Sequence, residues 1–225
     1  MAPPLAMRVR SMGMMLVLMP LLCTTAVHAV EADSASPPAV LLTAYGPFQG
    51  RGVNGSETVA RSLDGTMVGG ARITVLVLPV RWGEPERAVP AAVAQQHPVL
   101  LLGLGEGWPA TATVELQAVN KAEHPDEAGA PPPALLAAAG PEHRLATVEF
   151  DRTWFPAEAA VRASRDAGTY LCNNLLYVAA AQPVARAGFM HLPPQGDVPA
   201  AEYVARWAPL VKILIAHNLP SGPVP

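Results

Sequence analysis

The sequence predicts a single α/β domain, a three-layer α/β/α arrangement in which helices cover both faces of an open, mostly parallel, twisted sheet. Short apolar runs alternate with helix-like segments along the chain, as strands joined by helical crossovers do. The 225 residues are 51% hydrophobic, which suffices for one core of ordinary size. Neither an internal repeat nor a second domain is visible.

The strands are predicted from continuous apolar or β-branched runs that end at turn residues. Residues 39–44 form the first run, which is followed by a Gly-Pro turn. Such runs are typical of strands buried on both faces of a parallel sheet. The predicted strands cover residues 39–44, 73–80, 99–104, 115–119, 145–150 and 187–192.

Helices are predicted between these strands from the apolar spacing. Ser56 is interpreted as the N-cap of the first of them. The segments 120–133 and 219–225 are predicted to be loops because they are rich in turn residues. The predicted helices cover residues 56–63, 84–96, about ten residues from Cys172, and 199–218.

The first residues have the pattern of an export signal. Arg8 and Arg10 precede an apolar run over 12–23, which is followed by small residues up to Ala29. This order predicts cleavage after Ala29 and export to the periplasm or the medium. The apolar run is short for a bilayer of about 30 Å, so no stable membrane anchor is expected after processing. The predicted organisation is a cleaved signal (1–29), a flexible leader (30–38), the α/β domain (39–218) and a flexible tail (219–225).

Composition excludes several kinds of partner. The formal charge is −3 and no Lys/Arg cluster is present, so no nucleic acid partner is predicted. The histidines lack paired ligand spacing, and cleavage would leave one cysteine, so neither a metal site nor a cofactor is predicted. Gly103, Gly105 and Gly107 resemble a nucleotide loop, but Trp108-Pro109 follow where a helix should open; we interpret them as a sharp turn.

The segment around Cys172 carries the clearest chemistry. Gly168 permits a tight turn, and the apolar pattern after Cys172 is helical, which puts the thiol at the first turn of a helix, where the dipole favours a thiolate. The strand that follows this helix contains His191, and a right-handed crossover brings it back to the same sheet edge. This is the geometry of a nucleophile and its base. A carboxylate should orient the imidazole, and Glu115 is one of several candidates on spacing alone.

Each of these residues also has an ordinary structural interpretation. Cys172 could be a small buried hydrophobe, His191 a satisfied histidine at a strand end and Glu115 a solvated carboxylate. Spacing alone does not decide between these interpretations and catalysis.

At these residues the sequence resembles the pyroglutamyl peptidase I family, also called pyrrolidone carboxyl peptidases, over most of the chain that would remain after cleavage at residue 29. Residues 167–173 resemble its Ala-Gly-Thr-Tyr-x-Cys-Asn motif, and 188–193 its Gly-Phe-x-His-x-Pro. Residues 43–48 resemble Thr-Gly-Phe-x-Pro-Phe, 53–56 Val-Asn-Pro-Ser, and 115–120 Glu-Arg-x-Ala-x-Asn.

The resemblance implies a cysteine peptidase that removes N-terminal pyroglutamate from peptides without a cofactor. It implies that Cys172 is the nucleophile, His191 the base and Glu115 the third catalytic residue. It also implies an apolar pocket for the pyroglutamyl ring at Tyr45, Phe48, Tyr170 and Leu171, and a homo-oligomer. Ordinary core packing is the alternative for each of these aromatic residues.

The chain departs from the family at three places. Residues 121–127 are about two residues shorter than the family's loop and lack the arginine that it places near the oxyanion. Leu116 replaces the arginine beside the catalytic glutamate, and 156–167 are about ten residues short, so that a helix is truncated or missing. These departures leave two alternatives open: an inactive relative that binds blocked peptide N-termini, and a cysteine amidase of different acyl specificity.

Overall fold

The computed structural model describes residues 1–2 and 36–220. The predicted signal of residues 1–29 lies outside the described residues except for the first two. Residues 30–35 of the predicted leader and 221–225 of the predicted tail lie outside them as well.

A seven-stranded sheet forms the centre of residues 36–220, in the order β2-β3-β1-β4-β9-β5-β8. The four strands β3, β1, β4 and β9 are parallel, β2 and β5 are antiparallel to their neighbours β3 and β9, and β8 is parallel to β5. The predicted mostly parallel sheet is therefore confirmed. The strands are β1 (Ala39–Tyr45), β2 (Met67–Val68), β3 (Ala71–Leu78), β4 (Leu100–Glu106), β5 (Ala112–Glu115), β8 (Val161–Ser164) and β9 (Arg186–Leu192).

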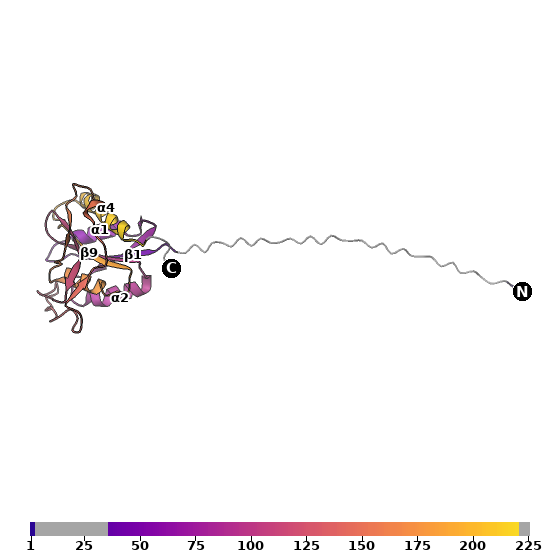
Figure 1. Cartoon of the computed structure of the whole chain (residues 1–225), viewed down its shortest axis with the longest axis horizontal. Coiled ribbons are helices and arrows are strands. Elements are labelled where there is room, and N and C mark those ends of the chain that lie inside the picture. The colour runs from indigo at the N-terminus through magenta and orange to yellow at the C-terminus, as the bar shows by residue number, and fades with distance from the viewer. Residues whose placement is uncertain (3–35, 221–225) are drawn as a thin grey trace. The chain divides into compact units, whose positions relative to one another are not determined.

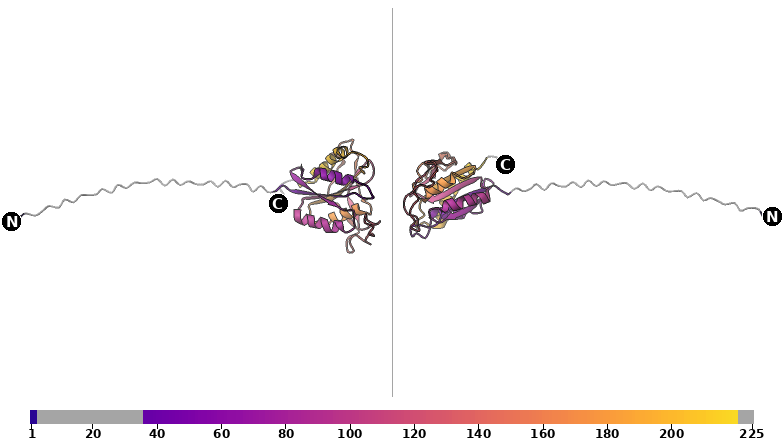
Figure 2. Two further views of the ribbon diagram at one scale, coloured as in Figure 1. Left: turned by 180° about the vertical axis from the view of Figure 1, so that it is seen from behind. Right: turned by 90° about the horizontal axis from the view of Figure 1, so that it is seen from below.

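Helices cover both faces of this sheet, as predicted (Figure 1). Helices α1 (Gly55–Leu63) and α4 (Ala200–Asn218) pack on one face, and α2 (Glu84–Gln96) and α3 (Leu171–Ala179) on the other. Figure 2 shows the same layers from behind and from below. None of the helices within the described residues is long and apolar enough to cross a membrane.

The central strands are continuous apolar runs because both of their faces are covered. Val40, Leu41 and Leu42 of β1 are fully buried, and so are Leu100 and Leu101 of β4. Each such side chain contributes roughly 1.5–3 kcal/mol when it leaves water. This burial fixes the register that brings the carboxyl ends of β1, β4 and β9 to one edge.

Several predicted elements need correction. The predicted strand 115–119 is interrupted at Leu116 because β5 ends at Glu115, and β6 (Gln117–Val119) pairs instead with β7 (His143–Leu145) in a separate two-stranded sheet. The predicted strand 145–150 is wrong: after Leu145 the chain is irregular, and the N–H groups of Thr147 and Val148 share one carbonyl, that of Ala187.

The interpretation of two short motifs was also wrong. Asn54, not Ser56, caps α1: its backbone is extended and its side chain accepts the Ser56 N–H at 3.0 Å. Gly103 and Gly105 lie inside β4 and not in a sharp turn, and Gly107 follows directly after the strand. Strands β2 and β8 and the 3₁₀ helix Arg152–Trp154 were not predicted. Between residues 156 and 167 the chain forms β8 and no helix.

Candidate active site

The predicted site residues meet at the carboxyl edge of the parallel strands. Strand β1 ends at Tyr45, β4 at Glu106 and β9 just after His191, and helix α3 begins at this same edge with Leu171. Open α/β sheets usually bind their ligands at this edge, because the loops there face a crevice between the crossovers. The topology therefore places a candidate site here before any side chain is considered.

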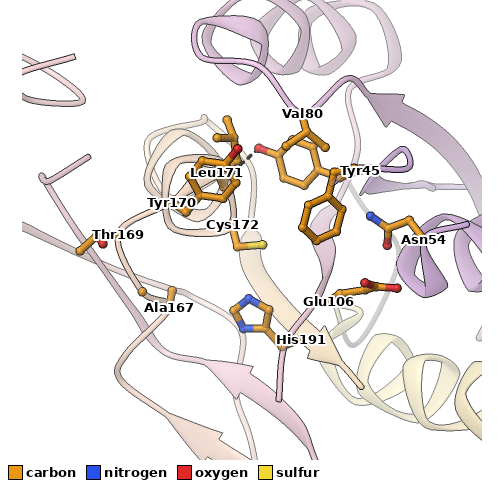
Figure 3. A pocket seen from close by; sticks show the side chains of 12 residues that line it. Tyr45, Asn54, Val80, Glu106, Ala167, Thr169, Tyr170, Leu171, Cys172 and His191 are labelled. Carbon is orange, nitrogen blue, oxygen red and sulfur yellow. Dashed lines mark hydrogen bonds between the residues drawn. The ribbon is translucent and has the colours of Figure 1, made fainter. Parts of the chain in front are cut away.

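Cys172 is the second residue of α3. Gly168 has a φ of +75°, which makes the turn into the helix, and no side chain caps the first N–H groups. These N–H groups have no intrahelical acceptor and, with the helix dipole, form a positive end beside the thiol. Cys172 is partly exposed, and its sulfur points into a cavity above the His191 ring (Figure 3).

His191 and Glu115 are brought together by the antiparallel pairing of β5 and β9. Thr113 lies opposite His191 in this pairing, and Glu115 follows two residues later on the same face of β5. The Nδ1 atom of His191 donates to Oε1 of Glu115 at 2.9 Å, and the Thr113 hydroxyl donates to the same oxygen at 2.5 Å. The Nε2 atom of the imidazole is thereby left for Cys172.

The electrostatics around Cys172, His191 and Glu115 favour a charged imidazole beside a charged carboxylate. Burial lowers the pKa of His191, but the charge of Cys172 and hydrogen bonds with Cys172 and Glu115 outweigh burial and raise the pKa to about 10. Burial raises the pKa of Glu115, but the hydrogen bonds from His191 and Thr113 help to outweigh it and hold the pKa below its ordinary value. The imidazole is thus held protonated beside an ionised carboxylate.

Three glycines make room for the side chains of Cys172, His191 and Phe189. A Cβ atom at Gly105 would lie 2.7 Å from the Cys172 sulfur, and one at Gly107 would lie 2.7 Å from Cβ of His191. A side chain at Gly103 would collide with the ring of Phe189. The spacing of two residues places all three positions on one face of an extended chain. Their role is therefore to supply space, which the sharp-turn interpretation did not foresee.

The cavity beside Cys172 has a volume of about 180 Å³. This is smaller than the roughly 300–1,000 Å³ of sites for drug-sized ligands, so it suits a small ring. All four predicted pocket residues line it. Figure 3 shows most of its lining, which consists of Tyr45, Phe48, Asn54, Val80, Glu106, Ala167, Gly168, Thr169, Tyr170, Leu171, Cys172 and His191.

Hydrogen bonds and ring contacts hold the apolar walls of this cavity in place. The Tyr45 hydroxyl donates to the Leu171 carbonyl at 2.7 Å, and burial raises the pKa of Tyr45, which stays neutral. The ring of Trp82 meets that of Tyr170 edge-on, with centroids 5.5 Å apart. The apolar wall is therefore preorganised before any ligand binds.

Glu106 is an acidic residue in the cavity lining that the sequence did not suggest. Its side chain is 3% exposed, one oxygen accepts the Gly55 N–H at 2.6 Å, and the other is paired with Arg51 at 2.6 Å. The Arg51 guanidinium also lies 4.0 Å from the centre of the Phe48 ring. The negative charge in the cavity is thus countered by a fixed partner.

The loop that lacks the family's arginine is tied down by a carboxylate. Asp126 accepts the N–H groups of Ala128 and Ala130 at 2.9 Å and that of Trp82 at 3.0 Å. Burial raises the pKa of Asp126, and these hydrogen bonds outweigh it and lower the pKa. His124, the histidine of this loop, is not among the residues that line the cavity.

Asn173 connects helix α3 to the same region. Its side-chain oxygen accepts the Val119 N–H at 2.8 Å, and its amide donates to the carbonyls of Val119 and Lys121 at 2.9 and 3.0 Å. Its place beside Cys172 in the motif is the sequence signal for this role. No group of three or more His, Cys, Asp or Glu side chains within residues 36–220 could hold a metal ion.

The fold and this trio together define a class of protein. A thiol at a helix start, backed by an imidazole and a carboxylate on an α/β sheet, is the arrangement of cysteine-dependent hydrolases. The profile of the pyroglutamyl peptidase family matches residues 38–204. The chain therefore belongs to the pyroglutamyl peptidase family, whose members are cysteine-type omega peptidases.

Individual relatives agree with this assignment. The pyrrolidone-carboxylate peptidase of Klebsiella pneumoniae is 33% identical over 172 residues, which cover 68% of this chain and 77% of that protein. The one from Yersinia pestis is 31% identical and covers 80% of this chain and 91% of its own. A mutant pyrrolidone carboxyl peptidase from Pyrococcus furiosus has a similar fold, with a TM-score of 0.72 and 24% identity over 80% of this chain and 97% of its own.

Proposed function

We propose that this chain hydrolyses the bond after an N-terminal pyroglutamyl residue, with Cys172 as the nucleophile, His191 as the proton carrier and Glu115 as the group that orients the imidazole. The observation that carries this proposal is the contact of His191 Nδ1 with the buried Glu115 carboxylate, on the side of the ring away from Cys172. Membership of the pyroglutamyl peptidase family supports the substrate class.

The first half of the reaction forms a thioester. The Cys172 sulfur attacks the carbonyl carbon of the pyroglutamyl group, and the carbonyl oxygen takes the negative charge. The backbone N–H groups at the first turn of α3 are the donors available to this oxygen, because no Lys or Arg side chain lines the cavity. His191 then gives its proton to the departing amine, and the carbon–nitrogen bond breaks.

The second half releases the acyl group. Water loses a proton to His191 and attacks the thioester carbon, the carbon–sulfur bond breaks, and pyroglutamate leaves. The proton then returns from His191 to the sulfur, or it remains on the imidazole, which leaves a thiolate beside an imidazolium. Glu115 keeps Nδ1 protonated throughout, so that Nε2 is the atom that exchanges protons with the thiol, the amine and the water.

The cavity discriminates between blocked and unblocked substrates. Tyr45, Phe48, Tyr170 and Leu171 provide an apolar wall suited to a neutral lactam ring, and Arg51 already pairs with the Glu106 charge. A free glutamyl group would bring a charged amine into this volume, which is costly without a partner.

Steady-state hydrolysis of a pyroglutamyl coumarin amide by the chain from residue 30 onward tests this proposal. We expect turnover that disappears in Cys172→Ala and falls strongly in Glu115→Ala, with the unblocked glutamyl amide a poor substrate. If the protein binds a pyroglutamyl peptide but shows no Cys172-dependent turnover, it is instead an inactive relative that binds blocked peptide N-termini. If it hydrolyses only amides of other acyl groups, it is instead a cysteine amidase of different specificity.

We also propose that the protein is exported and loses residues 1–29. The support is the basic start, apolar run and small residues that end at Ala29. Intact-mass analysis of protein from the exported fraction should give a chain that begins at Val30. Recovery of the full-length chain from the cytoplasm alone would refute this. The homo-oligomer implied by the family resemblance stays a prediction.

A further inference from the structure

A second cavity adjoins the catalytic one and shares part of its wall. It has a volume of about 280 Å³, and its lining includes Trp108 and Asp166. His191, Ala167 and Gly168 line both cavities, whereas Cys172 and the four aromatic or apolar pocket residues line only the first. The imidazole therefore stands at the boundary between the two spaces.

We propose that this second cavity binds the residue that follows pyroglutamate, and that Trp108 makes the enzyme favour an aromatic side chain there. The inference rests on the proposed function and adds a substrate preference to it. Of the residues of the predicted site, His191 is the one that lines this second cavity.

The direction of the reaction places the leaving group at this boundary. The acyl group fills the cavity that contains Cys172, because the sulfur must reach its carbonyl carbon. His191 must protonate the departing nitrogen, so that nitrogen has to lie beside the imidazole. The rest of the peptide then extends past His191, and the second cavity opens there.

Trp108 is the most exposed large hydrophobic side chain among residues 36–220, with 73% of its surface accessible. Its backbone is anchored, since the preceding Gly107 donates its N–H to the Leu192 carbonyl at 2.8 Å and packs against His191. An exposed aromatic ring that lines the second cavity, one residue after the glycine that packs against His191, offers a surface on which a second ring can stack.

Asp166 supplies the charge on the other wall. Its Oδ1 accepts the Gly168 N–H at 3.0 Å, and its own N–H donates to the Ser164 hydroxyl at 3.0 Å, so a turn fixes its side chain. A carboxylate held at this wall repels an acidic residue of the substrate. The second cavity should therefore prefer aromatic side chains and disfavour glutamate.

The test compares kcat/KM for the amides of pyroglutamyl-Phe, pyroglutamyl-Ala and pyroglutamyl-Glu. We expect the Phe peptide to exceed the Ala peptide by about tenfold, the scale of an aromatic contact with its buried area. Trp108→Ala should reduce this ratio below about twofold, and Trp108→Phe should retain most of it. Asp166→Asn should raise kcat/KM for the Glu peptide relative to the Ala peptide.

Met67→Ala is the matched control, because Met67 is exposed on the edge strand β2 and lines neither cavity. It should leave all three values unchanged. A Phe-to-Ala ratio that survives Trp108→Ala would overturn the inference, while Cys172-dependent turnover of the same peptides would leave the proposed function standing. Absence of turnover on all three peptides would overturn both.

Discussion

Gly105→Ala tests whether the geometry around Cys172 governs the rate. The added Cβ would lie 2.7 Å from the Cys172 sulfur and 2.7 Å from the ring of Phe189, against ordinary contacts of 3.4–4 Å. Because Gly105 lies in β4, hydrogen-bonded between β1 and β9, the strand cannot give way easily. The sulfur must therefore move by about 1 Å, and a displacement of this size can cost about 100-fold in rate.

The overpacked contact should also lower the free energy of unfolding, by about 1–3 kcal/mol. For a domain of this size, each kcal/mol lowers the melting temperature by about 2–4 °C. The variant should therefore stay folded at 25 °C, and its loss of activity should appear mainly in kcat. Hydrolysis of the pyroglutamyl coumarin amide gives kcat and KM, and thermal denaturation followed by circular dichroism gives the stability.

Gly52→Ala is the control, because a Cβ at Gly52 would meet no atom within 4 Å and its φ lies outside the left-handed region. It should change neither kcat nor the melting temperature appreciably. A folded Gly105→Ala protein with kcat within about threefold of the wild type would refute the reasoning, since the sulfur could then move without consequence.

Three further predictions follow from the charges and the loop. Because the pKa of His191 is raised to about 10, the melting temperature of the wild type should exceed that of His191→Ala most below pH 6.5, and this excess should shrink as the pH rises towards about 10; an excess that grows with pH contradicts this. Asp126→Ala leaves three N–H donors without their acceptor and should cost about 1–3 kcal/mol in denaturant unfolding, whereas an unchanged midpoint would mean that the loop does not depend on it. Compared side by side with a relative that carries the loop arginine, this chain should have a kcat about 100- to 1,000-fold lower at similar KM; equal rates would mean that the backbone donors suffice.

The main elements of the fold could be predicted because their signals are local. Helix α2 begins with Glu84-Pro85 and ends at Gln96, as predicted, with His97 as its C-cap. Strand β8 was not predicted because it lies at the edge of the sheet, where two of its four residues are exposed. Its sequence therefore shows little of the apolar pattern of a buried strand. The predicted strand 145–150 was wrong because the apolar side chain of Val148 fills the space over Gly188, and burial through such a distant contact gives the sequence the same apolar pattern as a strand.

The site could be predicted only in part, because several of its contacts join segments that are distant in the sequence. The crossover rule brings His191 to Cys172 from sequence order alone. Glu115 could not be distinguished from other acidic residues by spacing, because its role depends on the antiparallel register of β5 with β9. The pairing of Glu106 with Arg51 depends in the same way on the end of β4 meeting the segment between β1 and α1, which no local pattern encodes.

The placement of glycines on β4 explains why the catalytic and the binding parts of this site have different structural origins. The side chains of Cys172, His191 and Phe189 occupy space that Gly105, Gly107 and Gly103 leave empty, so Cys172 and His191 pack against the backbone of the central strand β4 and of the residue just after it. Such a backbone is held on both sides by ladder hydrogen bonds and moves little. Much of the lining of the two cavities comes instead from segments beyond the strand ends, including Phe48 and Trp108. Substitutions in these segments can alter which peptide binds while the distances that set the chemistry stay fixed.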